Sequence, residues 1–300
     1  MTQDALRVTL SYTGNTTDIH AIDMYDVAQA LIGFQRSLAL TTHLVLNGKI
    51  ITQSPSLKGA KIFSLPPEPG SWKFTAIVVA AGTGIFNLGT LERTSPLGHL
   101  VHSMYDYVVS ESLGFHVDYE QSLGQQYENY KKTSPPLPLP EIRQSQADSL
   151  IEKCSTAIHE MHRPIYMSNS ADAATLNVMI DQRSVPLHST FDLESFDYIH
   201  ETRKSDVAES FAGRITSYNS NTYKGRIYIH EIGRPVSFEL APLVRGGNEI
   251  RLITTSLRSN AMKQFREPGS VISIAGLKNT SRNGKLKTLT IVSVTPFSGE

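Results

Sequence analysis

Cationic and aromatic side chains recur at every second position of one short segment in the last third of the chain. They are Lys224, Arg226, Tyr228 and His230, and they alternate with glycine or isoleucine. Side chains at alternate positions of a β-strand point to the same face. Cations neutralise phosphates and aromatic rings stack on bases, so this face combines the two chemistries that nucleic-acid recognition needs. The segment therefore predicts a surface for an anionic polymer.

Further cations in the same region extend this candidate surface. Arg258 and Lys263 belong to a predicted helical segment, and Lys285 and Lys287 belong to the last predicted hairpin. Lysines on a hairpin are ordinary solvated residues, so each cation is weak evidence by itself. Contact with another protein, or a surface with no partner, stays open beside nucleic-acid binding.

The charge distribution supports a boundary near residue 203. Residues 1–202 carry 13 Lys and Arg against 21 Asp and Glu, a net charge of −8, whereas residues 203–300 carry 15 against 7, a net charge of +8. A basic module of this size favours an anionic partner. The alternative is that the acidic and basic parts attract each other, within one chain or between neighbouring subunits.

Two clusters have the residue types of a metal site. Asp18, His20, Asp23 and Asp26 lie close together in the chain, and His159 and His162 lie three residues apart. The acidic cluster is better explained by a helix N-terminus, where carboxylates offset the helix dipole. The histidine pair lacks the four-residue spacing of zinc proteases, and we expect surface histidines at a helix end. We predict no metal site.

Catalytic motifs are also weak. Cys154 is the only cysteine and lies on the apolar side of a predicted helix, which indicates a buried structural thiol. Gly82-Thr83-Gly84 lacks the third glycine and the following helix of a dinucleotide loop. We predict no cofactor and no catalytic residue, and favour a non-enzymatic protein. An active site assembled from distant residues would leave no local motif, so enzymatic activity stays open.

The elements that must position the basic residues follow the order of a small barrel. Alternation and turn residues predict three strands, a helical segment near residues 259–265, and two final strands; the strands cover 211–218, 224–230, 236–240, 271–277 and 286–294. This order resembles that of an oligonucleotide/oligosaccharide-binding (OB) barrel. The resemblance implies that the C-terminal part has a ligand-binding fold. An SH3-like barrel is the nearest alternative.

The N-terminal part predicts an α+β domain. A strand over residues 6–12 precedes a helix that begins near Asp23 and ends at Asn47-Gly48. We then expect a hairpin over 61–65 and 72–80, a helix from Ser95-Pro96 to Gly114, and a helix over 141–162. A strand is expected at 175–180, and the rest of 164–203 is expected to be loop. The expected organisation is an acidic α+β domain (1–132), a proline-rich linker (133–140), a helical or irregular extension packing on that domain (141–202) and a basic OB-like barrel (203–300).

Location is predicted from what the sequence lacks. The single cysteine and the polar N-terminus favour the cytoplasm, without a signal peptide. The run from Phe74 to Leu91 has no charge but contains three glycines, so a buried strand and turn is favoured over a membrane contact. A membrane-active effector that exposes this run stays as a minor alternative.

The helix segment from Asp23 to Leu31 and the tripeptide Gly70-Ser71-Trp72 resemble uncharacterised bacterial proteins of mobile elements and anti-phage defence loci. The resemblance implies a cytoplasmic accessory or sensor protein and assigns no residue a role. We expect the barrel to bind nucleic acid, DNA or RNA, and the acidic domain to mediate self-association or contact with a protein partner. The alternative is a scaffold whose basic barrel docks on an acidic protein surface.

Overall fold

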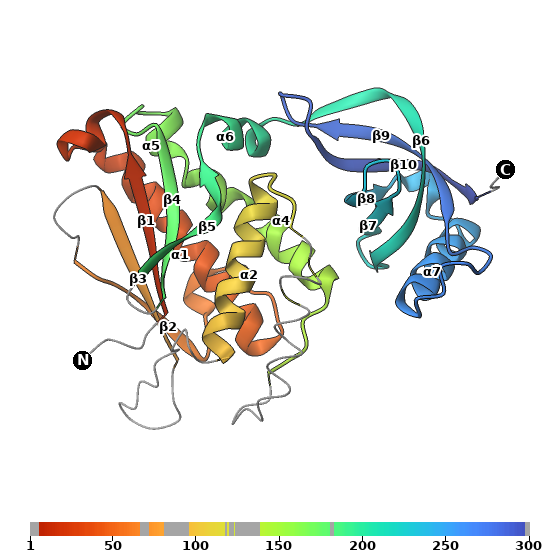
Figure 1. The fold of residues 1–300 in the computed structure, drawn as a ribbon, viewed down its shortest axis with the longest axis horizontal. Helices are drawn as coiled ribbons and strands as arrows, with labels where there is room; N and C mark the ends of the chain where they lie inside the picture. The colour runs from red at the N-terminus through yellow and green to blue at the C-terminus, as the bar shows by residue number, and fades with distance from the viewer. Residues whose placement is uncertain are drawn as a thin grey trace. The chain divides into compact units, whose positions relative to one another are not determined.

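The N-terminal sheet is antiparallel and has its earliest strand at the centre. In a computed structural model that describes residues 6–66, 72–80, 96–117, 119, 123, 139–180 and 183–297, the strand order is β2-β3-β1-β4-β5 (Figure 1). The strands are β1 (Leu6–Thr13), β2 (Ala60–Ser64), β3 (Lys73–Ala80), β4 (Ala173–Ile180) and β5 (Arg183–Phe191). The central strand β1 therefore pairs on one side with β3 and on the other with β4, whose residues lie far along the chain.

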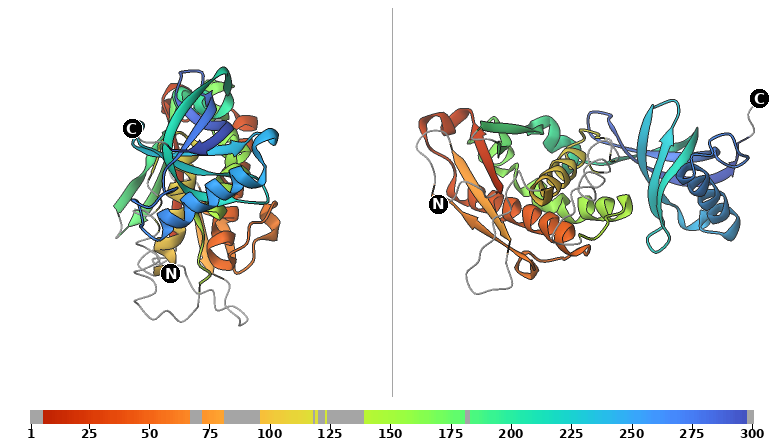
Figure 2. Two further views of the ribbon diagram at one scale, coloured as in Figure 1. Left: turned by 90° about the vertical axis from the view of Figure 1, so that its right-hand side faces the viewer. Right: turned by 60° about the horizontal axis from the view of Figure 1, so that its bottom comes forward.

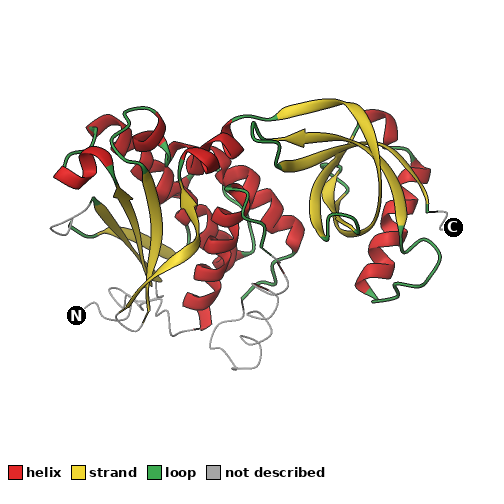
Figure 3. Cartoon of the chain, turned by 45° about the horizontal axis from the view of Figure 1, so that its top comes forward, coloured by secondary structure: helices red, strands yellow, loops and turns green. Residues whose placement is uncertain are grey.

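Helices cover one face of this sheet (Figure 3). They are α1 (Met24–Asn47), α2 (Pro96–Ser112), α4 (Gln144–Glu160), the short α5 (Arg163–Tyr166) and α6 (Leu193–His200). The buried side chains of β1, such as Leu6, Val8 and Leu10, share one apolar core with α1, α2 and α4. This arrangement confirms the predicted α+β class.

The ends of α1 lie where the sequence predicts them. Asp23 is the N-cap and its carboxylate accepts a hydrogen bond from the Asp26 amide at 2.9 Å. Gly48 ends the helix with φ 65° and donates its amide to the Leu44 carbonyl at 2.8 Å. Both contacts satisfy backbone groups that a helix end leaves open. The Asp23 and Asp26 carboxylates therefore belong to a helix start.

The region before the barrel contains more regular structure than the sequence suggests. Residues expected to form a loop between 181 and 203 include strand β5 and helix α6. β5 pairs with β4 through an irregular register between Thr175 and Asn177, and it contains Pro186. A proline and a bulge interrupt the alternation by which strands are recognised.

The C-terminal part is a closed five-stranded barrel with its own core (Figure 2). Its strands are β6 (Arg203–Asn219), β7 (Lys224–Ile229), β8 (Arg234–Leu240), β9 (Ile272–Thr280) and β10 (Leu286–Pro296), in the ring order β10-β8-β7-β6-β9. Helix α7 (Gly247–Ala261) lies between β8 and β9 in the chain, and β8 pairs with β10 in parallel while the other strand pairs are antiparallel. This five-strand order, with the helix between the third and fourth strands, confirms the OB-like barrel.

Two boundaries inside the barrel differ from the sequence-based expectation. β6 begins at Arg203 instead of near residue 211, and α7 occupies Gly247–Ala261 instead of the segment around 259–265. The first part of β6 is almost entirely exposed, so it lacks the inward apolar residues that mark a strand. Helix α7 carries isoleucine and threonine, whose branched side chains also suit strands.

The chain divides into two compact units, residues 1–199 and 200–300. Most of the proline-rich segment at 133–140 lies outside the described residues, as do residues 81–91 of the apolar run, whose first part is strand β3. Among the described helices, none is long and apolar enough to cross a membrane.

Candidate nucleic-acid interface

Strand β7 presents the alternation that the sequence predicts. Ile227 and Ile229 are fully buried in the barrel core, which directs Lys224, Arg226 and Tyr228 to the outer face. In the barrel, β7 lies between β6 and β8. Counted along the chain, β7 is the second strand of the barrel and β8 is the third. His230 follows the end of the strand and is exposed in the turn. Lys224 and Tyr228 are half-buried.

Arg226 differs from its neighbours because it is only 5% exposed. It is paired in register with Ser217 of β6 and Ser237 of β8. A long side chain on a strand flanked on both sides can be covered by residues of both neighbours. Arg226 therefore lies on the predicted face but does not present an exposed cation.

Lys287 has a partner inside the barrel unit. Its ammonium group donates to the Thr202 hydroxyl at 2.6 Å and to the Glu201 carbonyl at 3.3 Å. Partial burial lowers the pKa of Lys287. These contacts fix the start of β6 against β10, so Lys287 serves the barrel structure. Lys285, in the same hairpin, is exposed.

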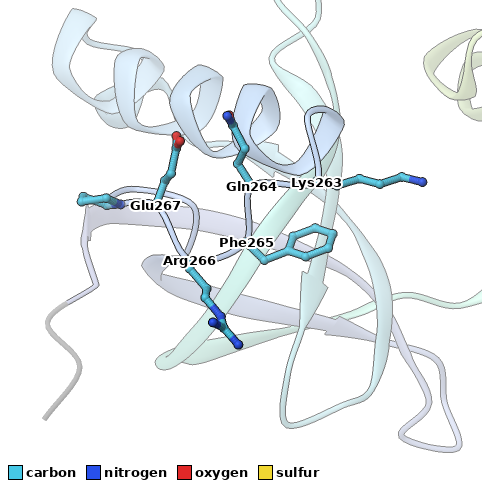
Figure 4. Close-up of a pocket in the computed structure, with 6 residues that line it drawn as sticks. Lys263, Gln264, Phe265, Arg266 and Glu267 are labelled. Atoms are coloured by element: carbon cyan, nitrogen blue, oxygen red, sulfur yellow. The ribbon is translucent and has the colours of Figure 1, made fainter.

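Arg258 and Lys263 are both exposed. Arg258 lies in the last turn of α7, and Lys263 lies just beyond the helix with φ 57°, a left-handed conformation that is uncommon outside glycine. Residues 263–268 line an open hollow of about 450 Å³. Figure 4 shows Lys263 and Arg266 extending from this loop in directions away from the carboxylate of Glu267. Lys263 and Arg266 thus belong to the same exposed loop, with their side chains extending in different directions.

Sequence reasoning missed two residues that complete this surface. The guanidinium of Arg214, on β6, lies 4.4 Å from the ring centroid of Phe265 and 5.5 Å from that of Tyr228. The Tyr228 ring meets the His230 ring edge-on at 6.0 Å. We call these four residues, Phe265, Arg214, Tyr228 and His230, the Arg214 ladder. Cation–π contacts of this kind are worth about 0.5–1 kcal/mol at exposed sites.

Phe265 and Arg214 carried different signals in the sequence. Arg214 alternates with Gly213 and Ile215, so its outward direction follows from strand periodicity. Phe265 lies in the loop beyond α7, and its contact with Arg214 joins residues that are far apart in the chain. Only the folded barrel reveals that pair.

Other aromatic and cationic contacts stabilise the barrel. Lys278 forms an ion pair with Glu209 at 2.6 Å and lies 5.6 Å from the ring centroid of Phe211. Arg245 donates to the Leu240 carbonyl and covers the ring of Tyr223 at 4.6 Å. The net charge of the module therefore overstates the number of cations that face outward.

The candidate reactive residues of the N-terminal unit have structural roles. Cys154 is buried as expected, and burial raises the pKa of its thiol to about 12, which keeps it protonated at neutral pH. His162 corrects the expectation of a surface histidine, because its side chain is fully buried. The chain turns from α4 into α5 at this point, which places the ring against Phe191 and Phe196.

The acidic cluster at the start of α1 is used in a similar way. Asp26 accepts a hydrogen bond from Arg163 Nε at 3.0 Å, and Arg163 also pairs with Glu160 at 3.4 Å. Arg163 lies over the Tyr25 ring at 5.3 Å. Within the described ranges, no group of three or more His, Cys, Asp or Glu side chains is arranged to hold a metal ion.

Comparison with known families divides the chain as the structure does. Residues 8–200 match a family described as "Domain of unknown function (DUF7946)", and residues 208–295 match one described as "Family of unknown function (DUF7947)". Searches of curated proteins and of solved structures give no significant match. The first match spans well over half of the 300 residues and the second covers the barrel. The chain therefore belongs to the DUF7946 family and carries a C-terminal DUF7947 domain.

Proposed function

We propose that this protein is a non-enzymatic nucleic-acid-binding protein in which the barrel holds the ligand and the N-terminal unit mediates assembly. The observation that carries the proposal is the net charge of +8 over residues 203–300, concentrated on an OB-like barrel. When such a module binds a nucleic acid, its cations neutralise phosphates and release the counterions condensed on them. This release favours binding and depends little on the base sequence.

The barrel topology supports the same reading. OB barrels bind oligonucleotides on the face of their second and third strands and on the adjoining loops. Here those strands are β7 and β8, and β7 presents Lys224 and Tyr228 outward. The hairpin turn between β9 and β10 adds the exposed Lys285. Cations and an aromatic ring on this strand and this turn support the proposal.

A salt-dependent titration tests the proposal. Fluorescence anisotropy of the full chain is measured with labelled single-stranded and duplex DNA and RNA over a series of salt concentrations. We expect affinity to fall steeply with salt, because each phosphate contact contributes about 0.7–0.9 to the slope of log K against log salt. Binding no tighter than millimolar at low salt, or affinity indifferent to salt, would refute it.

Charge reversal locates the binding surface. Lys285→Glu combined with Lys224→Glu should weaken binding to every sequence alike and reduce the salt slope. The matched control is Lys49→Glu combined with Lys153→Glu, which also reverses two charges, at exposed positions of the other unit. Equal losses in the barrel variant and the control would show that binding follows the overall charge and not this surface.

A second candidate is a scaffold whose basic barrel docks on an acidic protein surface. The net charge of −8 over residues 1–202 favours it, because a second copy of the chain supplies such a surface. Size-exclusion chromatography with light scattering separates the candidates. An oligomer that dissociates with salt and ignores nucleic acid would favour the scaffold.

A role as an accessory or sensor protein of anti-phage defence rests on resemblance alone. Phage plaque counts on cells with and without the gene test that role directly, and equal counts over a phage panel would remove it.

A further inference from the structure

We infer that Phe265 is a stacking site for an unpaired base, so that the barrel prefers single-stranded nucleic acid. This inference rests on the proposed function and identifies the ligand class and the contact residue. The ring of Phe265 is 45% exposed, although it lies against Arg214. An aromatic ring backed by a guanidinium and open to solvent has the form of a base-stacking platform.

Hydrogen bonds hold the loop that presents this ring. The Gln264 amide donates to the Ser259 carbonyl at 2.8 Å, and the Ser270 hydroxyl donates to the Phe265 carbonyl at 2.9 Å. The Ser256 hydroxyl connects α7 to the end of this loop and to β6. It donates to the Ser270 carbonyl at 2.7 Å and accepts from the Ile215 amide at 3.0 Å. The loop is therefore preorganised, which lowers the entropy lost on binding.

Arg214 supplies positive charge behind the ring. Its Nε is buried and has no hydrogen-bond partner among the described residues. Its guanidinium contacts are the rings of Phe265 and Tyr228.

Cations beside the ring suit the phosphates of the same nucleotide strand. Lys263 and Arg266 line the hollow with Phe265, and within the described ranges neither forms an ion pair with a carboxylate. The hollow is open to solvent and is lined by residues 263–268, so it offers a contact surface beside the ring. One base and its phosphate thus find a ring and two cations within one loop.

The chemistry favours single strands over duplexes. Base faces in a duplex are covered by their neighbours, whereas an unpaired base can leave the strand and stack on an aromatic side chain. Every base has such a face, so we expect preference for strandedness with little preference for sequence.

The test compares single-stranded and duplex affinity in the full chain. Phe265→Ala should weaken single-stranded binding by about 5- to 150-fold, which corresponds to the loss of one base–aromatic stack. Duplex binding, which depends on phosphates, should change less than about twofold. Phe265→Tyr should restore the wild-type preference because it keeps the ring.

Phe297→Ala is the matched control, since Phe297 is 48% exposed in the same unit. It should leave both affinities unchanged, and far-UV circular dichroism verifies folding of each variant. If wild type binds both forms and Phe265→Ala leaves their ratio unchanged, the stacking site is refuted while nucleic-acid binding stands. If wild type binds neither form, both proposals fail.

Discussion

Acidification should destabilise the N-terminal unit through one buried histidine. His162 Nδ1 lies 3.1 Å from the Ile158 carbonyl, and Nε2 lies 3.1 Å from the Ser195 hydroxyl. With the proton on Nδ1, the ring donates to the carbonyl and accepts from the hydroxyl, so the neutral form is satisfied. A second proton would place a charge in the core, where burial disfavours the charged form. Burial accordingly lowers the pKa of His162 to about 4.

The sign and size of the effect follow from proton linkage. Above pH 6.5, the ordinary pKa of histidine, both the folded and the unfolded chain hold this ring neutral. Between pH 6.5 and 4 the unfolded chain takes up the proton and the folded one does not, so stability is lost as the pH falls. At about 1.4 kcal/mol per pH unit, the loss is about 2 kcal/mol at pH 5 and about 3 kcal/mol below pH 4.

Trp72 makes the measurement specific for this unit. It is the only tryptophan of the chain and packs against the N-terminal core. Urea unfolding followed by tryptophan fluorescence at pH 8 and pH 5 gives the free energy of unfolding at each pH. In His162→Gln the difference between the two pH values should shrink by about 2 kcal/mol.

The comparison between variants cancels the other titrating groups. Burial also lowers the pKa of His43, which adds a loss of the same sign to wild type and variant alike. His230→Gln, at an exposed position of the barrel unit, should leave the pH dependence unchanged. An unchanged difference in His162→Gln would show that another group controls the acid response.

Two further substitutions test packing in each unit. Gly33→Ala should destabilise the N-terminal unit by about 1–3 kcal/mol in the same fluorescence assay, because the new Cβ would collide with the Ala157 carbonyl oxygen. This loss is expected although alanine is about 1 kcal/mol more favourable than glycine in a free helix. Gly247→Ala is the control, because nothing lies within 4 Å of its new Cβ, and it should leave stability unchanged or raise it. If Gly33→Ala also left stability unchanged, the close approach of α1 and α4 would be refuted. Ser256→Ala should lower the stability of the barrel by about 2 kcal/mol in a circular-dichroism melt, because it leaves the Ile215 amide and the Ser270 carbonyl without their hydrogen-bond partner. A change below about 0.5 kcal/mol would show that other groups bond to both.

Local signals predicted the element ends that depend on neighbouring residues. Asp23 and Gly48 bracket α1 because capping is a contact over three or four positions, which the sequence displays directly. The strand alternation of β7 is equally local. The order of strands and helix then sufficed to predict an OB-like barrel, since few closed arrangements accept that order.

Elements whose boundaries depend on distant contacts were missed. β6 extends back to Arg203 because its first residues pair with β9, from Arg203 opposite Thr280 to Gly213 opposite Ile272. Pairing over such a separation leaves no periodic pattern on an exposed strand. Helix α7 buries Ile253 and Ser256 against the barrel, and this tertiary packing outweighs the strand preference of its branched residues.

The candidate site shows why net charge alone is an incomplete guide to binding residues. Of the cations predicted to meet a ligand, Arg226 is covered and Lys287 holds the start of β6, whereas Lys263 is exposed beside Phe265. A cation that stabilises the fold and one that meets a phosphate contribute equally to a sum over the sequence. Only the second kind alters the salt slope when reversed, so Lys263→Glu should change that slope while Lys287→Met should mainly lower barrel stability. Equal slopes in the two variants would mean that the exposed loop is not where the phosphates bind.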